Sequence, residues 1–192
     1  PNIVVSDTLT EAASLALKLC DDLRNLREYQ KQGNSAVVSP LADTCAMRVA
    51  AVDALLRDAC AAMGVNQGQI SSMTCDVTST ASIEAAIHAT LERFGRIDVL
   101  INNVGGSAPG GPVDMSEEVW DAQIDHNLKS VFMMCKYVLP VMEHQGAGAI
   151  VNLSSTSGIR WTGSAQVAYA ATKAAVIQLG RVVAVQYAKK GI

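Results

Sequence analysis

The sequence of 192 residues has no excess of positive charge, no long uninterrupted apolar run and no closely paired cysteines. Fifteen Lys and Arg stand against eighteen Asp and Glu, so we expect no nucleic-acid partner and no membrane-surface partner. Charges interrupt the apolar runs well before the ~20 residues that a membrane span needs. The five cysteines show no CxxC spacing, which argues against a disulfide framework or a metal site and favours a reducing, cytoplasmic compartment.

Short apolar, β-branched segments alternate along the chain with longer segments of helical period. This alternation predicts an α/β fold with a parallel sheet covered by helices, and the nearly continuous apolar character of the strands suits burial on both faces. The predicted strands cover residues 3–6, 36–39, 70–75, 97–103 and 149–154. The predicted helices cover residues 9–31, 42–63, 80–94, 116–144 and 164–189.

The boundaries of the fourth helix follow from particular residues. Ser116 is a predicted N-cap, with two glutamates in the first turn behind it, and Pro140 is predicted to bend or end the helix near its last turn. The preceding stretch 105–112, with sequence GGSAPGGP, is a predicted loop just after a strand, where open α/β sheets bind ligands. No linker or repeat divides the chain, so we expect one domain over residues 1–192.

Tyr169 and Lys173 lie four residues apart in a predicted helix and therefore share one face. A free tyrosine is a poor acid–base catalyst near neutral pH. A positive charge about 5 Å away, at an effective dielectric near 20, favours the phenolate by about 3 kcal/mol. The composition alone predicts about 0.15 such pairs by chance, so the spacing needs support from other residues.

That support comes from polar residues placed at strand ends and in one helix. Ser155 ends the segment AIVNLSS, and Gly105 follows the strand segment INN, where a glycine lets the backbone approach a ligand closely. Asn127 lies in the middle of a predicted helix, where an amide is a mediocre helix former. Asp76 ends a third predicted strand, in the sequence CDVT.

In this order, these motifs resemble the short-chain dehydrogenase/reductase family from about residue 68 to the end. The matching motifs are CDVT, an NNAG-like NNVG, an asparagine in a helix, IVNxSS and YxxxK. The resemblance implies a Rossmann-like, doubly wound parallel sheet with helices on both faces. We expect the N-terminal third to be divergent and the domain to be incomplete at its C-terminal end.

The resemblance also implies roles for individual residues. Tyr169 would be the general acid/base, Lys173 would support it and contact the nicotinamide ribose, Ser155 would hold the substrate oxygen, and Asn127 would support a proton relay. The residues implied in cofactor binding are Asp76, Val77, Asn103, Val104, Gly105, Tyr169 and Lys173. The implied cofactor is NAD or NADP, and the implied substrate is a small carbonyl compound or alcohol, which the sequence does not identify further.

The sequence departs from the family pattern at three places. Ser155 precedes Tyr169 by fourteen residues rather than the usual thirteen, which leaves the hydroxyl of Thr156 as an alternative to that of Ser155. Val104 stands where alanine is common and adds bulk beside the cofactor. The glycine-rich phosphate-binding turn is missing, because no glycine occurs between Pro1 and Gln32.

Two interpretations of the chain remain at this stage. The first is an oxidoreductase that interconverts a carbonyl and a secondary alcohol. The second is a non-catalytic or truncated relative that keeps the fold and the oligomer interface without binding a dinucleotide. By resemblance we expect a homodimer or homotetramer through the helices near 116–144 and 164–189. Arg160 and Trp161 lie in a predicted loop that faces the substrate, and either contact it or pack within the loop.

Overall fold

The computed structural model describes residues 71–192 and, before them, residues 50–51, 53–55, 57–58, 61–62, 64 and 68. The chain divides into two compact units, residues 1–74 and 75–192, and the second is described below. The strands predicted at 3–6 and 36–39 and the helix predicted at 9–31 lie outside the described residues. Of the helix predicted at 42–63, every described residue is helical.

The second unit is built around two parallel strands joined by a long helical crossover. Strand β1 (Val99–Asn102) pairs with β2 (Ala149–Asn152), with Val99 opposite Ala149 and Asn102 opposite Asn152. Between them run α4 (Glu117–Ile124), the π-helical segment η2 (Asp125–Lys129) and α5 (Ser130–Gln145). This arrangement is a βαβ unit, which confirms the predicted α/β class.

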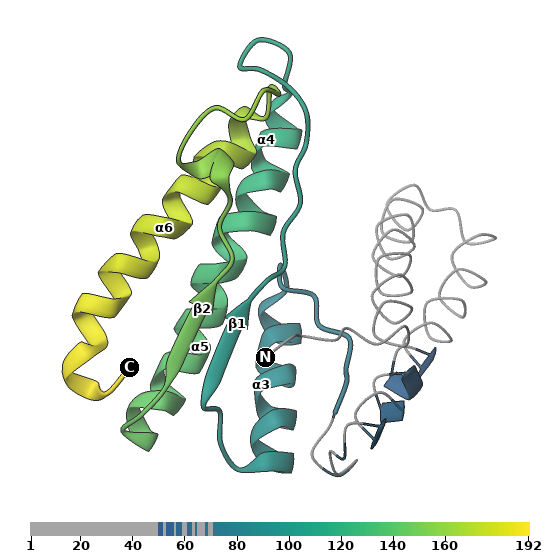
Figure 1. The fold of residues 1–192 in the computed structure, drawn as a ribbon, viewed down its shortest axis with the longest axis vertical. Helices are drawn as coiled ribbons and strands as arrows, with labels where there is room; N and C mark the ends of the chain where they lie inside the picture. Colours follow the sequence, from purple (N-terminus) through teal and green to yellow (C-terminus); the bar gives the residue numbers. More distant parts are fainter. Residues whose placement is uncertain are drawn as a thin grey trace. The chain divides into compact units, whose positions relative to one another are not determined.

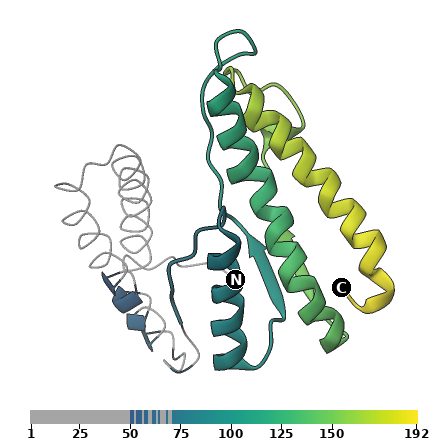
Figure 2. The ribbon, with the colours of Figure 1, turned by 180° about the vertical axis from the view of Figure 1, so that it is seen from behind.

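Three helices cover one face of the strand pair. Helix α3 (Thr80–Phe94) precedes β1, and α6 (Val167–Tyr187) follows β2 after a short 3₁₀ turn, η3 (Thr156–Gly158). A further 3₁₀ turn, η4 (Ala188–Lys190), continues from α6. The helices lie side by side with α5 in the middle, in contact with α3, while α6 contacts α4 and η2 (Figures 1 and 2).

The core lies between this helical layer and the strands. Leu100 of β1 is 7% exposed and packs with apolar residues of α5 and α6. The other members of this buried cluster are Val131, Cys135, Val138, Leu139, Met142 and Val176. Alternate residues of β1 point the other way, so that Val99 is 54% and Ile101 is 61% exposed. Within the part of the chain that the structure describes, helices therefore cover one face of the sheet.

Local sequence explains where the helices begin and end. The Ser79 side chain caps α3 by accepting from the backbone N–H of Ser82, and Ser116 accepts from that of Val119, which confirms the predicted N-cap. Helix α5 continues past Pro140 and ends at Gln145, because the left-handed Gly146, with φ 71°, terminates it. Of the two effects predicted for Pro140, ending the helix is therefore wrong, and bending it stays a prediction.

The strand predicted at 70–75 is also wrong for its described residues. Residues 71–75 form no strand, and side chains rather than a neighbouring strand satisfy the backbone at its end. The N–H of Asp76 donates to Ser82 Oγ (2.8 Å), and Asp76 Oδ1 accepts from the N–H of Thr78 (2.9 Å). These bonds form the turn before α3 in place of a ladder.

Helix α3 has the predicted limits 80–94, and the remaining predicted elements of this unit are present with altered ones. The strands predicted at 97–103 and 149–154 shorten to the four residues each of β1 and β2. The helix predicted at 116–144 contains the π-helical segment η2, which its hydrophobic pattern does not reveal. Residues Val167–Lys190 are long and apolar enough to cross a membrane by length and composition alone. In the structure this helix contacts β2 and buries Thr172 and Lys173.

Candidate active site

Asn127 lies in the π-helical segment η2 and is completely buried. Its Oδ1 accepts from the backbone N–H of Gly106 (2.8 Å), and its Nδ2 donates to the carbonyl oxygen of Gly106 (2.9 Å) and to Gln123 Oε1 (3.0 Å). A single side chain thus fastens the loop after β1 to the crossover helix. Such π-helical turns are frequent at functional sites, because they change the direction of a side chain within a helix.

Lys173 is 4% exposed, although it carries an amine. Its Nζ donates to the carbonyl oxygen of Leu153 (2.7 Å), just beyond β2, and lies 5.7 Å from the centre of the Tyr169 ring. Burial lowers the pKa of Lys173, because an apolar environment disfavours the charged amine. The predicted pairing of Tyr169 and Lys173 on one helix face is therefore present in three dimensions.

Gly105 completes this group because a side chain at its position would collide with the other two members. A Cβ built on Gly105 would lie 2.9 Å from Asn127 Oδ1 and 3.2 Å from Lys173 Nζ. A Cβ on the neighbouring Gly106 would meet nothing within 4 Å. Gly105 is exposed, so the backbone at this point offers an open, glycine-lined approach to two buried polar side chains.

Two contacts fix the segment after β2 against α6. Ser154 Oγ donates to the carbonyl oxygen of Lys173 (2.7 Å), and a Cβ on Gly158 would lie 2.7 Å from the backbone nitrogen of Ala174. Ser155 stands between these two anchors, half-buried, and accepts from the backbone N–H of Ser157 (3.2 Å) as the cap of η3. Ser154 and Gly158 both approach the backbone of α6 at Lys173 or at the next residue. Ser155 lies between them in the sequence and is therefore held close to this part of α6.

The predicted cofactor-binding residues occupy two stretches of the chain. Asn103, Val104 and Gly105 follow β1 directly and are exposed. Asp76 and Val77 lie in the turn before α3, half-buried, where the Asp76 carboxylate also accepts from the hydroxyl of Thr78 (2.7 Å). The structure thus groups Tyr169, Lys173, Asn127 and Gly105, while Asp76 and Val77 belong to a separate turn.

Several contributors were not identified from the sequence. Backbone atoms of Leu153 and Gly106 hold Lys173 and Asn127, and a backbone acceptor carries no sequence signal. Gln123 could have been found, because it precedes Asn127 by four residues, the spacing at which helix side chains meet. The buried amide of Asn102 donates to Asn152 Oδ1 (2.8 Å) across the strand pair, a contact that depends on the register of the two strands.

Comparison with known proteins places the chain in a family. Residues 36–192 match the family model of the short chain dehydrogenases. The oxidoreductase UcpA of Escherichia coli is 42% identical over 122 residues, which cover 64% of this chain and 46% of that protein. The D-threitol dehydrogenase of Mycolicibacterium smegmatis is 33% identical over 163 residues, covering 83% and 62% of the two chains.

A solved structure agrees with this assignment. A protein of Burkholderia xenovorans, assigned to the short-chain dehydrogenases/reductases, superposes with a TM-score of 0.69 at 55% identity and covers 74% of this chain and 55% of its own. The chain spans about half the length of the UcpA proteins that it matches. It belongs to the short-chain dehydrogenase family, and its fold is the Rossmann-type α/β fold.

Proposed function

We propose that the chain carries the catalytic residues of an oxidoreductase that interconverts a carbonyl and a secondary alcohol with NAD(H) or NADP(H). The observation that supports this most directly is the buried Lys173 amine, which lies 5.7 Å from the Tyr169 ring and is held by the carbonyl of Leu153. Burying an amine is costly unless it is hydrogen-bonded, as this one is to Leu153. Buried titratable groups of this kind cluster at functional sites.

Tyr169 protonates the carbonyl oxygen during reduction and accepts the alcohol proton during oxidation. Lys173 supports this role by holding its amine 5.7 Å from the centre of the Tyr169 ring. The hydroxyl of Ser155 holds the substrate oxygen beside the phenol. Asn127 keeps the glycine loop and, through it, the approach to Lys173 in place.

The open backbone at Gly105 and the Lys173 amine beside it suit the approach of a dinucleotide. The loop after β1 has no side chain where Asn127 and Lys173 approach it, and the Lys173 amine has N–H groups beyond the one that bonds Leu153. When bound, the dinucleotide supplies or accepts the hydride. Asn103, Val104 and Gly105 would line its adenosine side, and Asp76 and Val77 would border the adenine.

The Tyr169→Phe variant tests the proposed mechanism. Removal of the phenol hydroxyl should lower kcat/KM for a ketone by about 10³-fold, the range of a lost general acid, with an unchanged unfolding midpoint. Tyr137→Phe is the matched control, because the amine of Lys136 lies 5.4 Å from the Tyr137 ring on the helix α5, outside the candidate site. Equal activity of the parent and Tyr169→Phe would refute the mechanism.

Titration with NADH and then with NADPH separates the enzyme from a non-catalytic relative. The absence of glycine between Pro1 and Gln32 favours the interpretation of a non-catalytic relative, because the close approach of backbone to pyrophosphate needs glycine. Saturation of nicotinamide fluorescence at micromolar concentration supports the enzyme and identifies the preferred cofactor. No saturation at millimolar concentration supports the non-catalytic alternative.

A homodimer or homotetramer through α4–α5 and α6 is part of the proposal. It is supported by apolar side chains exposed on these helices, among them Phe132 (51%), Val182 (45%) and Val185 (81%). Sedimentation at micromolar concentration should then show a dimer or a larger species. A monomer alone would contradict this part of the proposal.

A further inference from the structure

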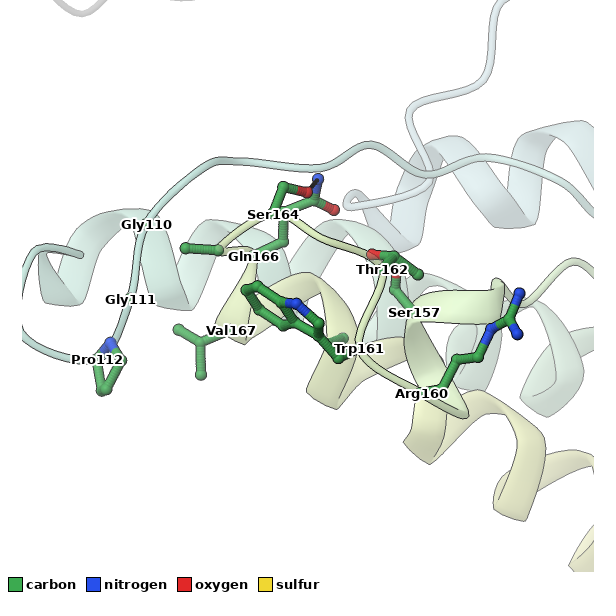
Figure 3. A pocket seen from close by; sticks show the side chains of 12 residues that line it. Gly110, Gly111, Pro112, Ser157, Arg160, Trp161, Thr162, Ser164, Gln166 and Val167 are labelled. Carbon is green, nitrogen blue, oxygen red and sulfur yellow. Dashed lines mark hydrogen bonds between the residues drawn. The ribbon is translucent and has the colours of Figure 1, made fainter.

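A cavity of about 470 Å³ lies between residues 110–112 and the segment 157–170 (Figure 3). Cavities of about 300–1,000 Å³ are typical of small-molecule sites. Tyr169 does not line this cavity, but the residue after it, Ala170, does, and so does Ser157, two residues after Ser155. The cavity therefore adjoins the candidate active site along both segments that carry its hydroxyl groups.

Hydrogen bonds hold the walls of the cavity in place without a ligand. The N–H of Gly110 donates to the carbonyl of Ala165 (2.9 Å), and the N–H of Val167 donates to the carbonyl of Gly110 (3.1 Å). Within the loop, the hydroxyls of Ser157 and Thr162 lie 3.2 Å apart in a hydrogen bond. A cavity formed in advance loses little conformational entropy when a ligand enters.

Most of the surface that the lining exposes is apolar, although four of its residues, Ser157, Thr162, Ser164 and Gln166, are polar. Trp161 is 73% exposed, and its indole ring stands beside the side chain of Val167 in Figure 3. In the same view Pro112 lies at one end of the lining and Arg160 at the other. Of the twelve described residues that line the cavity, Arg160 alone is charged, and no ion pair is found for it among the described residues.

We propose that this cavity binds the part of the substrate remote from the reacting carbonyl, and that this part is an aromatic or alicyclic ring bearing an anionic group. The ring packs on the Trp161 indole, and the Arg160 guanidinium binds the anion. A planar indole stacks well on a flat apolar ring, and a guanidinium binds a carboxylate through paired N–H groups. This inference rests on the proposed function, because the other end of the ligand is taken to be the carbonyl at Tyr169.

The residue that carries the phenol is the direct neighbour of a residue in the cavity wall. The Cα atom of Ala170, in the cavity wall, is one peptide away from that of Tyr169, about 3.8 Å. Adjacent helix residues point about 100° apart, so the ligand must pass over the first turn of α6 to reach the phenol. 4-Acetylbenzoate, which carries a carbonyl and a carboxylate at opposite ends of a ring, is a simple probe for such a ligand.

Fluorine NMR tests binding without any need for turnover. The chain has two tryptophans, so 5-fluorotryptophan labelling gives two resonances, which the Trp120→Phe variant assigns. 4-Acetylbenzoate should shift the Trp161 resonance saturably and leave that of Trp120 unchanged. Its affinity should fall about tenfold in Arg160→Gln and, in the parent chain, when 4-acetylbenzamide replaces the acid. No shift at Trp161, or equal affinities for acid and amide, would overturn the proposal.

Turnover of 4-acetylbenzoate tests whether the bound ligand is the substrate. Trp161→Ala should raise its KM about tenfold with little change in kcat, because the ring contact is remote from the reacting carbon. Ile159→Ala is the matched control, since Ile159 is 77% exposed in the same loop but does not line the cavity. An unchanged KM in Trp161→Ala would overturn the inference even if the ligand binds. If the parent reduces no carbonyl compound, the proposed function fails, while the NMR titration still decides whether the cavity binds the anion.

Discussion

The two neighbouring regions of the site are built in opposite ways. The polar group formed by Gly105, Asn127 and Lys173 places buried side chains on helices, with each polar atom held by a backbone or amide partner. The loop 156–166 instead carries exposed apolar side chains, Ile159 and Trp161, on a hydrogen-bonded turn. The helices thus supply the buried polar side chains, whose positions are fixed. The loop supplies the exposed apolar side chains, which can contact a ligand.

Substitutions in the two regions should therefore have different consequences. A change among the buried polar atoms leaves a partner without its hydrogen bond, which costs about 1–3 kcal/mol each time and displaces the others. A change on the exposed loop removes contact area and little else. We therefore expect large losses of activity from the first region and shifts in substrate preference from the second.

The largest effect is expected from a single methyl group at Gly105. In Gly105→Ala the new Cβ would lie 2.9 Å from Asn127 Oδ1, so either that side chain or the loop must move. Activity should fall about 10- to 100-fold, since misplacement of about 1 Å near the reacting groups has this cost. The measurement is kcat/KM with a ketone substrate, together with the affinity for the dinucleotide.

The neighbouring glycine supplies the control for this prediction. Gly106→Ala adds the same methyl group where nothing lies within 4 Å, and its activity should stay within about twofold of the parent. Equal losses in the two variants would show that the loop as a whole, rather than its approach to Asn127 and Lys173, determines the activity.

Much of this half of the fold follows from the sequence, because the signals are local. Helix α3 matches its predicted limits at both ends, with Ser79 and Gly95 as the caps, and Ser116 caps α4 as expected. Strand limits were less accurate, since a strand extends only where a partner accepts its hydrogen bonds. Residues 71–75 have the composition of a strand, yet they pair with no strand in the described part of the sheet.

Some features of the candidate site could likewise be predicted from local sequence, and others could not. The spacing of Tyr169 and Lys173 determines that they share a helix face, so their pairing could be predicted. The π-helical segment that carries Asn127 could not, because it changes the helical register without a change in hydrophobic pattern. The bonds of Asn127 to Gly106 and of Lys173 to Leu153 use backbone atoms, which every residue possesses.

Gly158 joins the two regions, and its substitution tests whether the loop depends on the helix for its position. A Cβ in Gly158→Ala would lie 2.7 Å from the backbone of Lys173 and of Ala174, and no rotamer change can relieve a clash with backbone. The free energy of unfolding should fall by about 2 kcal/mol, as measured by urea denaturation. Gly111→Ala, whose Cβ meets only Asp114 at 3.5 Å, should leave it unchanged. A stable Gly158→Ala variant would mean that the loop is not held by α6.

The smallest expected effect is the contribution of the Lys173 charge to the pH dependence of stability. This effect distinguishes the role of Lys173 in folding from its role in activity. Burial lowers the pKa of Lys173 in the folded chain, whereas an unfolded lysine titrates at about 10.4. Between these two values the unfolded state binds more protons, so the free energy of unfolding should rise with pH over that window.

The Lys173→Met variant should lack this rise of the free energy of unfolding with pH. The Lys136→Met variant, which changes an exposed lysine on α5, should keep it. Identical pH dependence in the parent and Lys173→Met would show that the amine is not desolvated. In the proposed enzyme the same rise in pH removes the positive charge beside Tyr169, so this lysine should favour folding at high pH while it ceases to support catalysis.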